Sequence, residues 1–238
     1  MKLCIHFLLF FVLSNQLSAN EKKTIRLGVV NYPPYYDFSD PKKPKGIVLG
    51  LISDFLGKTY ILEWEEIPLS RAAEALNSNL IDIYLGFRKT AEREKLLSYS
   101  KKPYLQAQPH LCGNKKAIQI LKKEDKLTGS IVIPSKAKVP KRLLEHETLA
   151  IDYSNYIQRG LSLLKSKRVS MVMVPEKFMT HIYLNNSEQV ECTSFGDPVL
   201  MYLVFKKYNP LRFEIAELKV PNFTQLATKA TEELLEKK

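Results

Sequence analysis

Histidine, cysteine and glycine, which often mark catalytic or metal sites, form no recognisable motif in this sequence. His110, His146 and His181 occur singly, without the spacing that brings several ligands to one metal ion. No pair of a nucleophile and a base has the sequence spacing of a known catalytic motif, and no glycine-rich loop has the phosphate-binding pattern. The sequence therefore predicts no metal, no cofactor and no catalytic residue, and it favours a binding protein over an enzyme.

Two of the cysteines, Cys112 and Cys192, lie well inside the chain, whereas Cys4 lies near its start. In an oxidising compartment two such cysteines often pair. Sequence alone does not tell whether their Cα atoms come within bridging distance. A disulfide and two free thiols both stay open.

Basic residues exceed acidic ones, with 36 Lys and Arg against 25 Asp and Glu and a formal net charge of +11. Such an excess is found in proteins that bind nucleic acid or anionic membranes. Here the lysines are spread along the chain, in pairs such as Lys22-Lys23 and Lys115-Lys116, without a basic block that includes aromatic residues. We expect solvated surface lysines and no nucleic-acid partner.

The first nineteen residues have the pattern of a signal peptide. Lys2 provides a positive start, residues 3–13 are almost entirely apolar, and a short stretch of polar and small residues ends at Ala19. About eleven apolar residues are too few to span a bilayer, which needs roughly twenty. Cys4 precedes the apolar run, so we expect no lipid-modified cysteine after cleavage. We predict that residues 1–19 are removed and that the mature protein is free in solution.

The rest of the chain alternates between strand and helix patterns. The predicted strands are 24–30, 61–67, 80–86, 108–112, 130–134, 169–174 and 199–205. The predicted helices are 46–58, 71–77 with Ser70 as its N-cap, 140–146, 153–164, 175–184, 213–218 and 223–235. Strands that alternate with helices favour parallel sheets with right-handed crossovers, so the predicted fold class is α/β. Ligands of such sheets bind beyond the carboxyl ends of the strands.

Four segments of the chain resemble the periplasmic solute-binding proteins that serve ABC transporters for polar amino acids. They are residues 25–29 (IRLGV) followed by 32–35 (YPPY), residues 46–51, residues 80–93, which contain Gly86 and TAER, and residues 97–104 (LSYSKKPY). The resemblance covers nearly the whole mature chain. It implies a two-lobed periplasmic binding protein fold of type II, also found in ionotropic glutamate receptor ligand-binding domains, in which each lobe is a mostly parallel sheet flanked by helices.

The resemblance also implies how the chain is divided between the lobes. Lobe one would consist of residues 20–105 and 201–238, and lobe two would be the insert 106–200. The chain would cross between the lobes near 103–109 and 196–201. Two crossings favour a hinge, since few residues have to absorb the rotation that closes the lobes on a solute.

The resemblance further implies ligand-binding residues in lobe one. Arg93 stands where amino-acid binders carry the arginine that holds the ligand's α-carboxylate, and a planar guanidinium donates two hydrogen bonds to such a group. Tyr32 resembles the aromatic wall of the site, and Leu69 and Arg71 fall at its side wall. Gly86 belongs to the same stretch as Arg93. The alternative interpretations are exposed arginines at helix starts and an ordinary core aromatic residue.

Three further positions depart from the family pattern. Arg88, followed by Lys89, stands where a small hydroxyl residue is common, and a second cation there would favour a ligand with an additional anionic group or exclude an ordinary amino acid. In lobe two, Ser135 is the only hydroxyl residue kept from a glycine-threonine loop. Glu176 stands at or beside the position of the acid that holds the ligand's ammonium group, or else it is a first-turn helix residue stabilised by the helix dipole.

We therefore expect a monomer that closes on a small polar, carboxylate-bearing solute in the periplasm. The solute would pass to an ABC transporter permease or be presented to a membrane sensor. Two alternatives stay open. One is a dehydratase-like enzyme of the same fold with Glu176 or Asp37 as general acid, and the other is a scaffold protein without a ligand.

Overall fold

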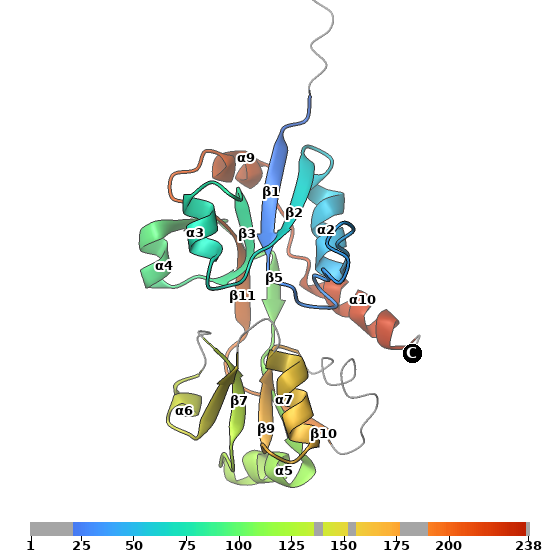
Figure 1. The fold of residues 1–238 in the computed structure, drawn as a ribbon, viewed down its shortest axis with the longest axis vertical. Coiled ribbons are helices and arrows are strands. Elements are labelled where there is room, and N and C mark those ends of the chain that lie inside the picture. Colours follow the sequence, from blue (N-terminus) through green and yellow to red (C-terminus); the bar gives the residue numbers. More distant parts are fainter. Residues whose placement is uncertain (1–20, 136–139, 152–155, 177–189, 237–238) are drawn as a thin grey trace, which may run out of the picture.

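The computed structural model describes residues 21–135, 140–151, 156–176 and 190–236, which form two lobes, each built on one β-sheet (Figure 1). The predicted signal peptide, residues 136–139 and most of the predicted helix 175–184 lie outside the described residues. The two-lobed α/β fold predicted from the sequence is confirmed.

The first sheet has the strand order β2-β1-β3-β11-β4, and β5 also pairs with β11. Its strands are β1 (Thr24–Val29), β2 (Ile61–Glu66), β3 (Ile83–Arg88), β4 (Leu97–Tyr99), β5 (Leu105–Ala107) and β11 (Val199–Lys206). β1 is parallel to β2 and β3, whereas β11 is antiparallel to β3, β4 and β5. The helices of this lobe are α2 (Ile47–Leu56), α3 (Ala72–Asn77), α4 (Ala91–Leu96), α9 (Leu211–Glu217) and α10 (Thr224–Glu236) (Figure 1).

The second sheet has the strand order β10-β6-β9-β7-β8. Its strands are β6 (His110–Asn114), β7 (Ile131–Pro134), β8 (Thr148–Ile151), β9 (Met171–Val174) and β10 (Val190–Ser194). β7 is parallel to β8 and β9, whereas β6 is antiparallel to β9 and β10. The helices of this lobe are α5 (Lys115–Glu124), α6 (Lys141–Leu144) and α7 (Tyr156–Lys165).

Two predictions about local structure are wrong. The third strand was expected over 80–86 but spans Ile83–Arg88, because the N–H groups of Leu80 and Ile81 bond back to the carbonyl of Ala75 and close the turn after α3. The N-cap of α3 is Arg71, without a side-chain hydrogen bond, so Ser70 does not cap this helix.

The side chains of β3 are buried on both faces of the first sheet. Ile83 and Leu85 belong to one core cluster, while Tyr84 and Phe87 belong to another on the opposite face. A strand covered on both faces is apolar at nearly every position. The sheet is therefore held between two packed layers, and the end of β3 has a well-defined position.

Helix α2 begins on the loop that follows β1 rather than on a side-chain cap. The N–H groups of Ile47 and Leu49 donate to the carbonyls of Pro34 and Tyr35, at 2.9 and 3.2 Å. A Cβ atom at Gly46 would lie 2.2 Å from the Tyr35 carbonyl oxygen, and the φ of Gly46 is +144°. Only glycine fits this close approach, so Gly46 holds the helix against the loop.

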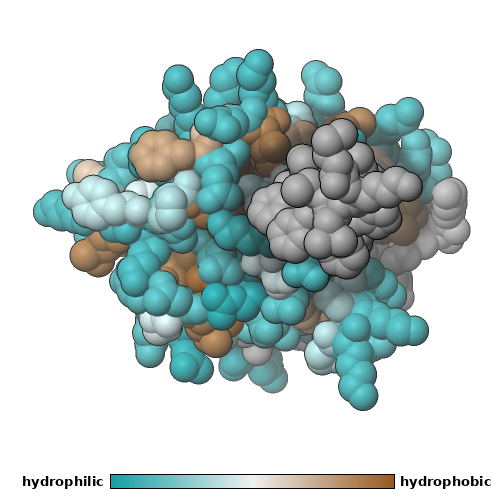
Figure 2. Space-filling view, turned by 90° about the horizontal axis from the view of Figure 1, so that it is seen from above, coloured by the Kyte–Doolittle hydropathy of each residue, from teal (hydrophilic) through white to brown (hydrophobic). Residues whose placement is uncertain are grey.

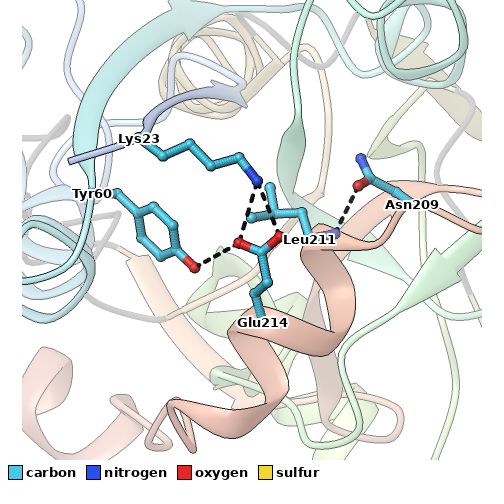
Figure 3. Close-up of polar contacts among 5 residues, drawn as sticks. All are labelled: Lys23, Tyr60, Asn209, Leu211 and Glu214. Carbon is cyan, nitrogen blue, oxygen red and sulfur yellow. Dashed lines mark hydrogen bonds and ion pairs between the residues drawn. The ribbon is translucent and has the colours of Figure 1, made fainter. Parts of the chain in front are cut away.

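Helix α9 contacts the residues that immediately precede β1 and β2 (Figure 3). Pro210 is the N-cap of the helix, and the side-chain oxygen of Asn209, just before it, accepts the N–H of Leu211 at 2.9 Å. Glu214 accepts hydrogen bonds from the Lys23 ammonium group at 3.1 Å and from the Tyr60 hydroxyl at 3.3 Å. The exposed contact with Lys23 and the part-buried contact with Tyr60 join segments that are far apart in the sequence.

The surface seen from above carries apolar side chains among many polar ones (Figure 2). Charged residues such as Lys58 and Lys123 are exposed on different lobes, in agreement with the spread of lysines along the sequence. None of the described helices has the length and apolar character needed to cross a membrane.

Cys112 on β6 and Cys192 on β10 are joined by a disulfide. The two residues stand directly opposite each other in the antiparallel pair, and their Cα atoms are 4.1 Å apart. The bond therefore ties the edge strand β10, which leads back to the first lobe, to the interior of the second sheet. The sequence had left this pairing open.

Replacing both cysteines, as Cys112→Ala with Cys192→Ala, should destabilise the protein by up to about 4.5 kcal/mol, since the bond closes a loop across 80 residues of separation. Urea unfolding of the variant and of the unreduced wild type measures the difference. Equal stability, or two free thiols in the unreduced wild type, would contradict this expectation.

Candidate ligand-binding site

The carboxyl ends of the parallel strands in the two sheets face each other between the lobes. In Figure 1, β1 points down toward the second lobe and β7 points up toward the first. Strand β3 is parallel to β1, and β9 is parallel to β7. Tyr32 and Arg88 therefore lie at one edge, and Ser135 and Glu176 lie at the other. This is where α/β sheets bind ligands.

An aromatic loop follows β1 at this edge. The N–H of Tyr32 donates to the carbonyl of Tyr36 at 2.7 Å, and the N–H groups of Tyr35 and Tyr36 donate back to the carbonyl of Tyr32 at 3.0 Å. The Tyr32 and Tyr35 rings lie 6.2 Å apart, and the Tyr36 hydroxyl contacts the Tyr104 hydroxyl at 3.0 Å. All these tyrosines are largely buried, and the predicted aromatic wall, Tyr32, is itself part of the core.

Glu176 lies just beyond β9 and is half-buried. Its Oε1 accepts the backbone N–H of Gln108 at 3.0 Å. Burial raises the pKa of Glu176 from 4.5 to about 7, and the bond from Gln108 partly opposes this rise. Among the described residues, no Lys, Arg or His forms an ion pair with Glu176.

Glu176 also acts on the aromatic loop of the other lobe. The pKa of Tyr35 is raised mainly by burial and further by the nearby charge of Glu176. A carboxyl group of the second lobe is thus close to a loop of the first lobe.

Arg93 is held by local interactions at the start of α4. The Thr90 side chain accepts the N–H of Arg93 at 3.3 Å and thereby caps the helix. The guanidinium lies over the Phe87 ring, 4.2 Å from its centre, and Nη1 donates to the Arg88 carbonyl at 3.2 Å. Within the described part of the chain no carboxylate pairs with Arg93. The planar group is oriented and carries an uncompensated charge.

Tyr99, which the sequence did not single out, lies close to Arg93. Burial raises the pKa of Tyr99 to about 12, Arg93 lowers it, and Glu94 raises it. The Tyr99 hydroxyl is buried and has no hydrogen-bond partner among the described residues. Nothing in the sequence around Tyr99 (LSYSKK) distinguishes a tyrosine of the site from an ordinary aromatic residue of the core.

Gly86 forms an irregularity in β3 that orients the end of the strand. Its φ is +108°, and the register with β11 shifts between Tyr202 and Leu203. A Cβ atom at Gly86 would meet no heavy atom within 4 Å, so the space beside it is open. A glycine bulge of this kind redirects the residues that follow, here Phe87 and Arg88.

The surroundings of the remaining predicted residues do not indicate a role in ligand binding. Leu69 packs on the core cluster around α3, and Arg71 is exposed at the start of that helix. Ser135 extends the pairing of β7 with β8, its N–H donating to the Ile151 carbonyl at 2.6 Å. The described residues contain no group of histidine, cysteine and acidic side chains that fits a metal ion. The structure thus groups Arg93 with Arg88 and Gly86, and Glu176 with the aromatic loop.

Glu176→Gln should raise thermal stability at pH 8 and have little effect near pH 5. The folded-state pKa of Glu176 lies above its unfolded value, so the free energy of unfolding falls as the pH rises from about 4.5, and the loss is complete only above about pH 7. Thermal unfolding at both pH values measures the change. The exposed Glu232→Gln is the matched control, and an equal change in both variants would contradict the assignment.

Solved structures with the same fold were identified by comparison of the whole chain. The GluR0 ligand-binding core in complex with L-glutamate has a TM-score of 0.70 and 17% identity, over 91% of this chain and 98% of that chain. A cysteine-binding protein from Campylobacter jejuni has a TM-score of 0.66 and 16% identity, over 90% and 86%. The ancestral amino-acid-binding protein AncCDT-1, a precursor of cyclohexadienyl dehydratase, has a TM-score of 0.67 and 17% identity, over 90% and 93%.

At such low identity these structures establish the fold alone. No curated protein sequence matches the chain. The family model for bacterial extracellular solute-binding proteins, family 3, matches residues 25–210, which includes both sheets and every predicted site residue. The chain therefore belongs to the family 3 bacterial extracellular solute-binding proteins.

Proposed function

We propose that the protein binds a small zwitterionic solute, of the amino-acid type, between its two lobes. Arg93 of the first lobe would hold the carboxylate, and Glu176 of the second lobe would hold the ammonium group. The observation that carries this proposal is that both charged groups are partly buried and that neither forms an ion pair with another described residue. A ligand with one anionic and one cationic end would neutralise both.

The surroundings of Arg93 favour this role over that of a solvated arginine. Phe87 and the Arg88 carbonyl orient the guanidinium, so less conformational entropy is lost when a carboxylate binds. The open space at Gly86 lies at the same end of β3. Arg88, at that strand end, is proposed as a contact for a further polar group of the solute.

We also propose export to the periplasm and delivery of the solute to an ABC transporter permease or a membrane sensor. Membership of an extracellular solute-binding family supports this role, as does the signal-peptide pattern of residues 1–19. A monomer is sufficient for the proposed binding, because each lobe contributes one end of the site.

A second candidate function, a dehydratase-like activity, is favoured by one observation. A carboxyl group with a pKa of about 7, such as Glu176, is suited to act as a general acid. One protein of similar fold is described as a precursor of cyclohexadienyl dehydratase. Appearance of a product in the binding samples, lost in Glu176→Gln, would favour the enzyme.

Arg93→Ala should weaken binding by more than about 2 kcal/mol, or roughly thirtyfold, because a charge-assisted pair is lost. A thermal-shift screen of the twenty standard L-amino acids and small dicarboxylates identifies the solute, and calorimetry measures its affinity. Arg71→Ala is the matched control and should change the affinity little. If the affinity is unchanged in Arg93→Ala but falls in Arg71→Ala, the solute's carboxylate binds Arg71 instead of Arg93.

Binding of the same solute should weaken by about tenfold between pH 8 and pH 6. The carboxyl group of Glu176, with a pKa of about 7, is mostly ionised at pH 8 and mostly protonated at pH 6, where it no longer attracts an ammonium group. Glu176→Gln should bind more weakly at pH 8 and lose this pH dependence. A wild-type affinity that is constant from pH 6 to pH 8 contradicts the assignment.

A further inference from the structure

The chain passes between the two sheets at two neighbouring places. It leaves the first sheet after Ala107 and enters the second at His110, and it returns between Ser194 and Val199. The two crossings touch, since the N–H of Phe195 donates to the Pro109 carbonyl at 2.8 Å. Any rotation of one lobe against the other has to change backbone angles in these segments.

Gln108, in the first crossing, contacts both crossings with its side chain. Its Nε2 donates to the carbonyls of Pro109 and Gly196, each at 3.2 Å. Its carbonyl accepts a hydrogen bond from Nδ1 of His110 at 2.7 Å. Gln108 therefore fastens the first crossing to the second.

The contact on the second crossing is itself well anchored. Gly196 has a φ of +80°, and a Cβ atom there would lie 2.8 Å from the Pro140 side chain. Glycine is needed at such a close approach. The Gly196 carbonyl is thus held against the second lobe and offers Gln108 a defined acceptor.

The backbone of Gln108 contacts the candidate site directly. Its N–H donates to Oε1 of Glu176 at 3.0 Å. The direction of this N–H depends on the backbone angles of the first crossing, and those angles are restrained by the side chain of the same residue. The orientation of the Glu176 carboxylate is therefore linked to the conformation of both crossings.

We propose that Gln108 is a positioning residue, which locks the two crossings together through its side-chain amide and so holds Glu176 in the orientation that receives the cationic group of the solute. The role in ligand binding rests on the proposed function, whereas the locking of the crossings does not. Gln108 does not itself have to touch the solute. Its effect passes through the carboxylate of Glu176.

Hydrogen exchange without any added solute tests the lock. In Gln108→Ala, the backbone amides of the non-proline residues in 105–110 and 194–199 should exchange at least several times faster, while those of β1 and β7 should keep their rates. Gln108→Glu, which has nearly the same shape but no amide donor, should behave like Gln108→Ala. Gln106→Ala is the matched control, since Gln106 is an exposed glutamine two residues earlier and it is its backbone N–H, not its side chain, that donates to Thr224.

The titration of Glu176 gives a second readout, in which a loss of packing alone would act in the opposite direction, because exposure to water lowers the pKa of a carboxyl group that burial has raised. The bond from Gln108 lowers the pKa of Glu176, so loosening the crossing in Gln108→Ala should raise that pKa above about 7. Carboxyl NMR of the solute-free protein measures it, with Glu176→Gln to assign the signal. Unchanged exchange and an unchanged titration in Gln108→Ala would overturn the proposal, as would a Gln108→Glu variant identical to the wild type.

Both readouts separate this proposal from the proposed function. If no amino acid binds but the exchange and titration change as expected, the lock stands and the zwitterion assignment fails. If an amino acid binds through Arg93 and Glu176 but Gln108→Ala behaves like Gln106→Ala, the function stands and Gln108 is not a positioning residue.

Discussion

The proposed site depends most on one carboxyl group, that of Glu176. It is partly removed from water and forms no ion pair with a described cation. Glu176 has one described hydrogen bond, from the backbone of Gln108, and a pKa raised by burial. Placing a charge in such surroundings costs free energy unless a partner arrives. The partly buried Arg93 of the other lobe has the opposite charge, and no carboxylate among the described residues pairs with it. Under the proposed function, a solute that carries both charges would offset both costs when the lobes close on it.

The local structure of the first lobe holds Arg93 and the aromatic loop in place. Gly46 lets α2 begin directly on the aromatic loop, so that the loop carbonyls replace a side-chain cap. Gly86 redirects the end of β3, and Thr90 fixes the first turn of α4, from which Arg93 projects. Each of these residues has conformational freedom or hydrogen-bonding capacity that its neighbours lack. The candidate site depends more on these local backbone features, a close approach, a bulge and a helix cap, than on the number of charged residues.

Much of the fold could be predicted because strand and helix patterns are local. The near-continuous apolar run of β9 and the alternation in β1 correspond to observed strands. The short strands β4 and β5 were missed, since three residues carry no periodicity and pair only through β11, a hundred residues later. Helix α5 was also missed, although Asn114 caps it and Ala117, Ile118 and Leu121 face the core at helical spacing.

The candidate site could be predicted in part. Arg93 and Glu176 were proposed from the resemblance of their motifs. Their surroundings could not be predicted, because the contacts of Gln108 with Gly196 and Glu176 join residues 88 and 68 positions apart. The interaction between Tyr35 and Glu176 likewise joins residues far apart in the sequence. Such contacts arise only when the two crossings and the two sheet edges are brought together. No periodicity or composition contains that information.

The central claim is that one solute spans Arg93 and Glu176, and a calorimetric cycle with solute analogues tests it most directly. The tightest-binding amino acid, its carboxamide and its deaminated analogue are each titrated into the wild type, Arg93→Ala and Glu176→Gln at pH 8. We predict that loss of the carboxylate weakens binding to the wild type and Glu176→Gln but not to Arg93→Ala. Loss of the ammonium group should weaken binding to the wild type and Arg93→Ala but not to Glu176→Gln. Equal losses in all three proteins would contradict the account.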